Sequence, residues 1–344
     1  MAAYEQLSAF GMSPTEIGKQ VGTRRDRVQK SLKVGADATA SAALVEHDLT
    51  LDQAAFVAEV SDNDTDVARL LDGAKRGSFD HAAQRVRDDR TERDAIAKTV
   101  AELIEQGITV IDYAQTYAQG TTVDTLSSLA DEEGTVITSE IHAGCPGHVA
   151  ALRYLSYNET TSVVWACSDW KGNGHRDCHQ GGSSQSGAMS EEDKLARREV
   201  IANNKAWDSA QTVRRAWLRS FLGRKTAPKD AGQVMASILT SDTHVVAKAL
   251  GQRNSLATEL LGQEASTEYG APSPLVALVE QAQPARAQVI ALGVVLAAVE
   301  ASLSRHSWRN PSSSDARYLT TLSAWGYELA DIEHIITDHQ QAKN

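Results

Sequence analysis

Residues 13–33 read SPTEIGKQVGTRRDRVQKSLK, and this stretch decides the fold of the amino-terminal part of the chain. Ser13 and Glu16 have the three-residue spacing of a capping box, and Pro14 stands at the first helical position, where its missing N–H costs nothing. Gly22 can adopt the left-handed conformation that ends a helix. The pattern therefore predicts a helix, a glycine turn and a second helix.

The two helices are expected to pack through a small apolar seam. Ile17 and Val21 lie four residues apart and predict the buried face of the first helix. Thr23 is expected to cap the second helix, which would bury Val28 and Leu32. The remaining faces of the second helix are polar and mostly basic, and this combination is typical of a helix-turn-helix.

The second helix has the composition of a DNA-recognition helix. In a helix-turn-helix the start of this helix enters the major groove, so Arg24, Arg25 and Gln29 are expected to meet base edges. Lys30 and Lys33 are better placed for phosphates. The full set of predicted DNA-binding residues is Thr23, Arg24, Arg25, Arg27, Gln29, Lys30 and Lys33. The alternative interpretation is an ordinary helical hairpin with a solvated basic face.

Two flanking segments extend the pattern. Residues 4–13, YEQLSAFGMS, precede the motif, and residues 48–55, DLTLDQAA, follow it after a spacer. Together, roughly residues 1–95 resemble the DNA-binding half of ParB-type partition proteins, in which a helix leads into the motif and a Leu-Ser/Thr-x-x-x-Ala element begins a supporting helix. The nucleotide-binding clamp of that family carries a Gly-Glu-Arg-Arg motif, which does not occur in this sequence, so nucleotide binding is not expected.

The resemblance implies a function in binding rather than catalysis. It implies sequence-specific contact with double-stranded DNA, in plasmid or chromosome segregation or in regulation. A homodimer is expected because one helix-turn-helix reads only a half-site. A partition ATPase and a separately encoded clamp-domain protein are the candidate partners.

Length and composition limit the class of protein further. At 344 residues the chain is long enough for two or three domains. The formal net charge of −11 argues against indiscriminate coating of nucleic acid, so DNA contact must come from a local basic patch. No signal peptide is visible, and the longest apolar run, residues 289–299, is shorter than the roughly 20 residues of a membrane span. We therefore expect a cytoplasmic protein, located at the nucleoid or a plasmid, with no membrane partner.

Helical spacing dominates the chain and predicts a mainly α fold. Three domains are expected: a helix-turn-helix domain over 1–106, a small α+β Cys/His module with a β-hairpin over 107–180, and a helical carboxy-terminal domain over 181–344. Further expectations are a flexible loop over 172–190 and helices over 79–104, 191–222, 230–250, 274–303 and 313–341. The basic helix from 191 either adds phosphate contacts or presents a solvated face.

All three cysteines and four of the ten histidines fall within residues 142–179. Cys145 and His148 have the two-residue spacing of a zinc knuckle. A hairpin centred on Asn158 and Glu159 would place Val149 opposite Ala166, and so bring Cys167 beside His148. His175 is the first choice for a fourth ligand, with Cys178 and His179 as alternatives, and His142 is expected to lie outside the set. The predicted metal ligands are Cys145, His148, Cys167 and His175.

Thiolates together with imidazoles favour zinc, and four protein ligands would make the site structural. One alternative is that the cysteines are buried, the histidines are exposed and no metal binds. Another is a metal-dependent nuclease of the His-Asn-His type, with Asp169, Asn173 and His175 beside the metal. The arrangement that such an enzyme needs is not recognisable here, so the chain is not expected to be an enzyme.

Overall fold

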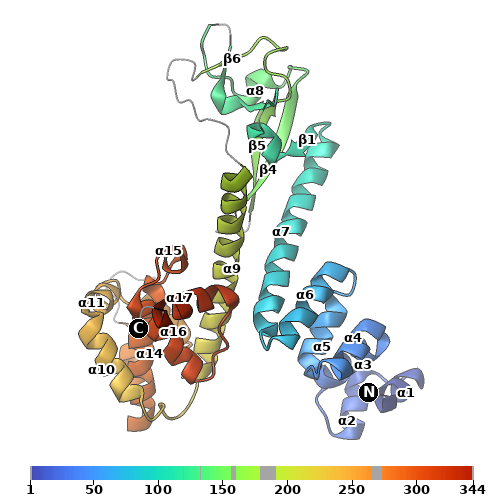
Figure 1. The fold of residues 1–344 in the computed structure, drawn as a ribbon. Helices are drawn as coiled ribbons and strands as arrows, with labels where there is room; N and C mark the ends of the chain where they lie inside the picture. Colours follow the sequence, from blue (N-terminus) through green and yellow to red (C-terminus); the bar gives the residue numbers. More distant parts are fainter. Residues whose placement is uncertain are drawn as a thin grey trace. The chain divides into compact units, whose positions relative to one another are not determined.

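The structure is a computed structural model that describes residues 2–118, 120–131, 133–155, 160–178, 191–264 and 273–342. These residues form seventeen α-helices and six short strands, so the chain is mainly helical, as predicted (Figure 1). It divides into two compact units, residues 87–199 and residues 1–86 with 200–344. This division differs from the predicted domains, because the outer parts of two long helices, α7 (Phe79–Glu105) and α9 (Glu191–Leu222), belong with the sheet.

The amino-terminal part of the larger unit is built from short helices. Val34, Val57 and Leu70 are fully buried in the core that the later helices share. The helix that the DLTLDQAA segment was expected to begin starts at Leu51, where Thr50 and Gln53 form a second capping box. The helices before α7 are α1 (Ala2–Ala9), α2 (Pro14–Val21), α3 (Arg25–Ala36), α4 (Ala38–Glu46), α5 (Leu51–Glu59) and α6 (Asp64–Lys75).

The predicted helix, turn and helix are present as α2, Gly22 and α3. The Ser13 hydroxyl accepts the backbone N–H of Glu16, and the Glu16 carboxylate accepts the backbone N–H of Ser13 at 2.8 Å. Gly22 has φ 70° and donates its N–H to the carbonyl of Gly18. A Cβ on Gly18 would lie 2.9 Å from the carbonyl oxygen of Thr23, so the turn packs directly against this glycine. The start of α2 and the turn are confirmed.

Three details of the motif differ from expectation. Thr23 does not cap α3; Arg24 holds the cap position with extended backbone and no side-chain hydrogen bond, because Thr23 still belongs to the turn and donates its N–H to Gly18. Val21 is exposed, since α2 ends there, and Leu32 is only half-buried. The buried residues are Ile17, Val28, Ser31 and Val34.

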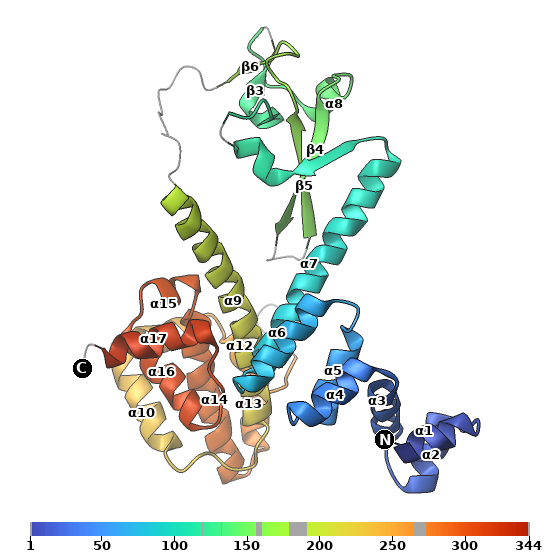
Figure 2. The ribbon, with the colours of Figure 1, turned by 45° about the vertical axis from the view of Figure 1, so that its right-hand side comes forward.

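The smaller unit contains a four-stranded sheet in the order β1-β4-β5-β2 (Figure 2). Strand β1 (Thr109–Asp112) runs parallel to β4 (His148–Leu155), which pairs antiparallel with β5 (Thr160–Cys167). Val149 lies opposite Ala166 and His148 opposite Cys167, so the predicted hairpin register is confirmed. The proposed turn at Asn158 and Glu159 lies outside the described residues.

Short elements complete this unit around a small core. Leu126, Leu129 and Ile137 pack together with Cys167. Part of the predicted loop over 172–190 is a turn followed by a strand, and its remainder, residues 179–190, is outside the description. The remaining elements are β2 (Asp124–Thr125), β3 (Leu129–Ala130), β6 (Arg176–Asp177), the 3-10 helices η1 (Tyr113–Tyr117) and η2 (Leu126–Ser128), and α8 (Ser139–His142).

The carboxy-terminal helices surround α14 (Pro284–Ser302). Leu292 and Leu296 on this helix are fully buried. Among the described residues, α14 is the one helix long and apolar enough to cross a membrane, and its burial in the helical core explains that composition. The others are α10 (Ala231–Ser241), α11 (Thr243–Gly251), α12 (Ser255–Leu260), α13 (Pro274–Glu280), α15 (Arg305–Arg309), α16 (Ser313–Ala324) and α17 (Asp331–Gln341).

A buried ion network crosses this helical core. The Arg214 guanidinium on α9 donates to both carboxylate oxygens of Glu300, at 2.7 and 3.0 Å, and also to Glu333. The hydroxyls of Tyr318 and Tyr327 donate to the same two carboxylates. Burial alone would lower the pKa of Arg214, but the charges of Glu300 and Glu333 raise it well above its usual value. The network therefore stays ionised inside the core.

Candidate functional site

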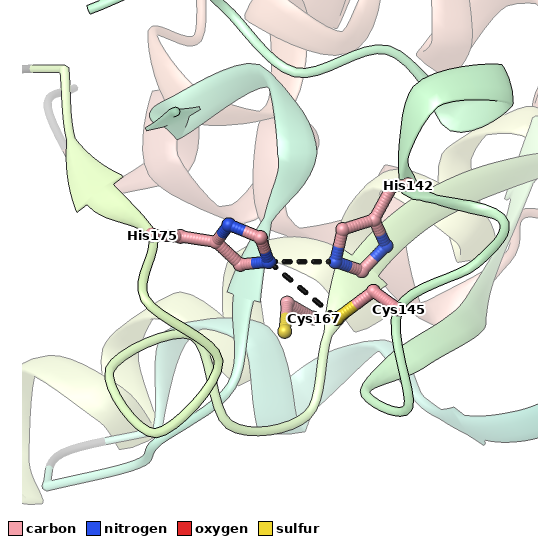
Figure 3. Close-up of side chains that lie close together, drawn as sticks. All are labelled: His142, Cys145, Cys167 and His175. Carbon is pink, nitrogen blue, oxygen red and sulfur yellow. Dashed lines mark hydrogen bonds between the residues drawn. The ribbon is translucent and has the colours of Figure 1, made fainter. Parts of the chain in front are cut away.

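Four side chains of the smaller unit bring their donor atoms together. His142, Cys145, Cys167 and His175 each offer one ligand atom, and these atoms all lie within 4.8 Å of one another. The four side chains point toward a common centre (Figure 3). His175 Nε2 lies 3.1 Å from His142 Nε2 and 3.5 Å from Cys145 Sγ. Such a cluster could hold a metal ion.

Successive turns of the chain place the first two donors. Thr138 caps α8, and His142 ends this helix with its backbone N–H on the Thr138 carbonyl. The N–H of Cys145 then bonds to the His142 carbonyl, and that of His148 to the Cys145 carbonyl. A Cβ on Gly147 would lie 2.6 Å from Cys167 Sγ, so the turn between Cys145 and His148 passes directly over the second thiol. This close approach requires glycine.

The environment of Cys167 suits a thiolate ligand. Its side chain is fully buried at the end of β5, and burial raises the pKa of the thiol. The Asn173 amide donates to Cys167 Sγ at 3.5 Å, and the backbone N–H of Asp169 also bonds to this sulfur. N–H donors aimed at sulfur stabilise its anionic form. A bound cation would supply the remaining stabilisation that burial removes.

The predicted ligand set needs one correction, because His142 takes the place of His148 among the converging donors. Although His148 lies opposite Cys167 in the sheet, its ring stacks on Trp165 with a centroid distance of 4.8 Å and an interplanar angle of 18°. His148 Nδ1 instead lies 2.8 Å from Nδ1 of His142, on the side of that ring away from His175. His148 is thus placed to orient His142.

The other candidates for the fourth ligand are not in the cluster. Cys178 is exposed, and its backbone N–H bonds to the Ser128 carbonyl after β6. His179 lies outside the described residues. His175 follows a turn in which its N–H bonds to the Trp170 carbonyl, and it completes the group as expected. The signal for His142 was present in the sequence, since it falls in the same Cys/His-rich segment behind a Thr138 cap.

The start of α3 forms a basic surface in the larger unit. Arg24, Arg25, Arg27 and Gln29 are exposed, whereas Thr23 is half-buried in the turn. An open depression lies beside this surface, between the turn and the start of α5. It is lined by Gly22, Thr23, Arg24, Asp26, Arg27, Lys30, Leu51 and Asp52.

The two lysines expected to meet phosphates have protein partners. Lys30 pairs with Asp52 at 2.5 Å, and Lys33 pairs with Glu59 at 3.5 Å. All four side chains are largely solvent-exposed, and exposed ion pairs contribute about 0–1 kcal/mol. A nucleic-acid phosphate could therefore compete for either lysine.

The second basic region, α9, presents fewer free cations than its sequence suggests. Arg214 is fully buried, and Arg215 donates to Glu300 at 3.4 Å. Arg219 pairs with Glu259 at 3.0 Å. Trp207, Leu218 and Leu222 line the helical core, so core packing of the apolar side of α9 is confirmed.

No protein-family model matches this chain, and none of the curated proteins or solved structures compared with it does so either. The fold and the two candidate sites therefore have to be interpreted from their own residues. The Cys/His cluster lies in the smaller unit and the basic surface in the larger one.

Proposed function

We propose that this protein binds double-stranded DNA at specific sequences through α3, in the manner of a ParB-type partition or regulatory protein. One observation carries the proposal. A capped helix α2, a left-handed Gly22 and an exposed arginine-rich start of α3 follow one another in the order of a helix-turn-helix. We further propose that the Cys/His cluster binds zinc and stabilises the small unit.

The start of α3 has the properties of an anion-binding helix end. The Arg24 side chain makes no cap hydrogen bond, so the first N–H groups of α3 have no side-chain acceptor there. The helix dipole adds partial positive charge at this end, where a phosphate oxygen is a suitable acceptor. Arg25 and Arg27 extend the same positive region. These features support phosphate anchoring next to base readout.

Base readout is assigned to the long side chains on the exposed part of α3. Arginine donates two parallel hydrogen bonds to guanine, and glutamine recognises adenine in a similar way. Arg24, Arg25 and Gln29 are exposed and make no contact with the core of this unit. The net charge of −11 favours contact limited to this patch.

The composition of the Cys/His cluster supports structural zinc. Two sulfurs and two imidazole nitrogens match the tetrahedral preference of zinc. His142, Cys145, Cys167 and His175 would fill all four positions and leave none for an activated water. This donor set favours a structural role over the metal-dependent nuclease, and the unit has only a small apolar core of its own.

Selection of bound fragments from genomic DNA, followed by gel-shift titration, tests the DNA-binding proposal. Arg25→Ala should weaken specific binding by about 1–3 kcal/mol, while Lys33→Ala should weaken binding to all sequences alike. Lys248→Ala is the control, because it removes an exposed cation from α11. Unchanged affinities for both α3 variants would contradict the proposal.

A further inference from the structure

Strand β5 leaves most of one edge without a partner. Along its other edge it pairs with β4 at every residue from Thr160 to Cys167. On the free side, β2 reaches only Ala166 and Cys167. Within the part of the chain that the structure describes, no strand pairs with this side of residues 160–165 (Figure 2). The backbone N–H and C=O groups on that side are therefore open to another strand.

The composition of this edge does not oppose pairing. Residues 160–165 read TTSVVW, with no charge, proline or glycine, and β-branched and aromatic residues favour strands. Natural edge strands are normally protected by lysines, prolines, bulges or very short length. The opposite edge of the sheet, β1, is only four residues long and ends at the acidic Asp112. Of these two edges, β5 is the one suited to association.

We propose that β5 pairs antiparallel with β5 of a second copy of this chain, so that two sheets join across a twofold axis. An antiparallel pair of identical strands is complementary to itself, because each hydrogen bond is repeated by the symmetry. The absence of charge matters for this choice of partner. Two copies that each carry −11 meet here without like charges facing each other.

The size of the contact predicts a weak dimer. Six residues of strand span about 20 Å, and such a pairing buries less than a standard protein interface. Dissociation in the micromolar range is therefore expected. Only the consequence for function rests on the proposed DNA binding: two joined chains would present two copies of α3 to two half-sites. The pairing itself can be tested without DNA.

Sedimentation equilibrium of the full chain, without DNA, tests the interface with a charge swap at Ser162. Near a twofold axis, Ser162→Lys in both copies places like charges close together, and so does Ser162→Glu. Each variant alone should raise the dissociation constant at least about fivefold. An equimolar mixture of the two should associate more tightly than either alone. A misfolded variant would not show this recovery.

Arg153→Gln is the matched control. Arg153 lies opposite Ser162 on β4, so its substitution changes the charge beside the edge strand and leaves the edge unaltered. It should associate like the wild type. Three results would overturn the proposal: a wild-type chain that is monomeric at 100 μM, variants that dimerise as tightly as the wild type, or a mixture no tighter than its components. DNA affinity, measured separately, decides the proposed function.

Discussion

His142 and His148 illustrate how two similar residues acquire different roles. Their Nδ1 atoms lie 2.8 Å apart, but it is His142 whose Nε2 also approaches His175. We expect His142→Ala to abolish stoichiometric zinc binding. His148→Ala should lower zinc affinity only about 10- to 100-fold, as removal of a ligand-orienting partner does.

Elemental analysis and the visible spectrum of the cobalt-substituted protein distinguish these roles. If His148 only orients His142, the cobalt spectrum of His148→Ala keeps the bands of a two-sulfur, two-nitrogen site. Zinc retained by His142→Ala and lost by His148→Ala would instead restore the ligand set expected from the sequence.

Zinc binding should depend on pH through a thiol rather than through His142. Burial, helped by His148 and His175, lowers the pKa of His142 to about 4 from its usual 6.5, so this imidazole is already neutral at pH 6. Burial raises the pKa of Cys167, whose thiol must lose its proton when zinc binds. Affinity should therefore rise between pH 6 and 8, by about tenfold per pH unit for each proton released. Calorimetry in buffers of different ionisation enthalpy counts these protons, and a count of zero would contradict the expectation.

At the level of elements, the best-predicted features are the most local ones. The Ser13 capping box and the Gly22 turn depend on residues within four positions of each other, so the sequence alone specifies them. Thr23 was misassigned because the turn that packs on Gly18 continues through it, and residue preference does not reveal that packing.

The metal cluster shows where prediction from sequence ends. Alternation of residues and the hairpin register placed Cys167 opposite His148 correctly. Which imidazole then reaches the sulfurs depends on Trp165, which holds the His148 ring by stacking, and on the four-residue helix α8, which delivers His142. These are contacts between elements, and residue spacing does not encode them.

The helices α9, α14 and α17 are tied together by the Arg214 network, which hydropathy did not predict. Arg214→Met leaves Glu300 and Glu333 buried without their cation and should lower the free energy of unfolding by about 3–5 kcal/mol. Arg219→Met is the control, because its surface pair with Glu259 should contribute about 1 kcal/mol or less. Urea denaturation followed by tryptophan fluorescence measures both, and equal losses would contradict the assignment.

For the whole molecule, the sign of the net charge makes DNA binding sensitive to salt. A chain of −11 has little attraction for a duplex apart from its basic patches, so phosphate contacts near α3 must supply most of the electrostatic affinity. The logarithm of affinity should fall linearly with the logarithm of salt concentration, with a slope of about −0.9 per phosphate neutralised. Lys30→Ala should make this slope shallower by about one, and fluorescence anisotropy across a salt series measures it. An unaltered slope would remove Lys30 from the phosphate contacts.

Helix α14 affects how this protein would fail under stress. Its 19 residues form a continuous oily segment that stays hidden only while its neighbours remain closed around it. Once heat separates them, such segments stick to one another faster than the chains can refold. Thermal inactivation should then end in a precipitate, and the shelf life of the purified protein would be set by the rate at which these neighbours open.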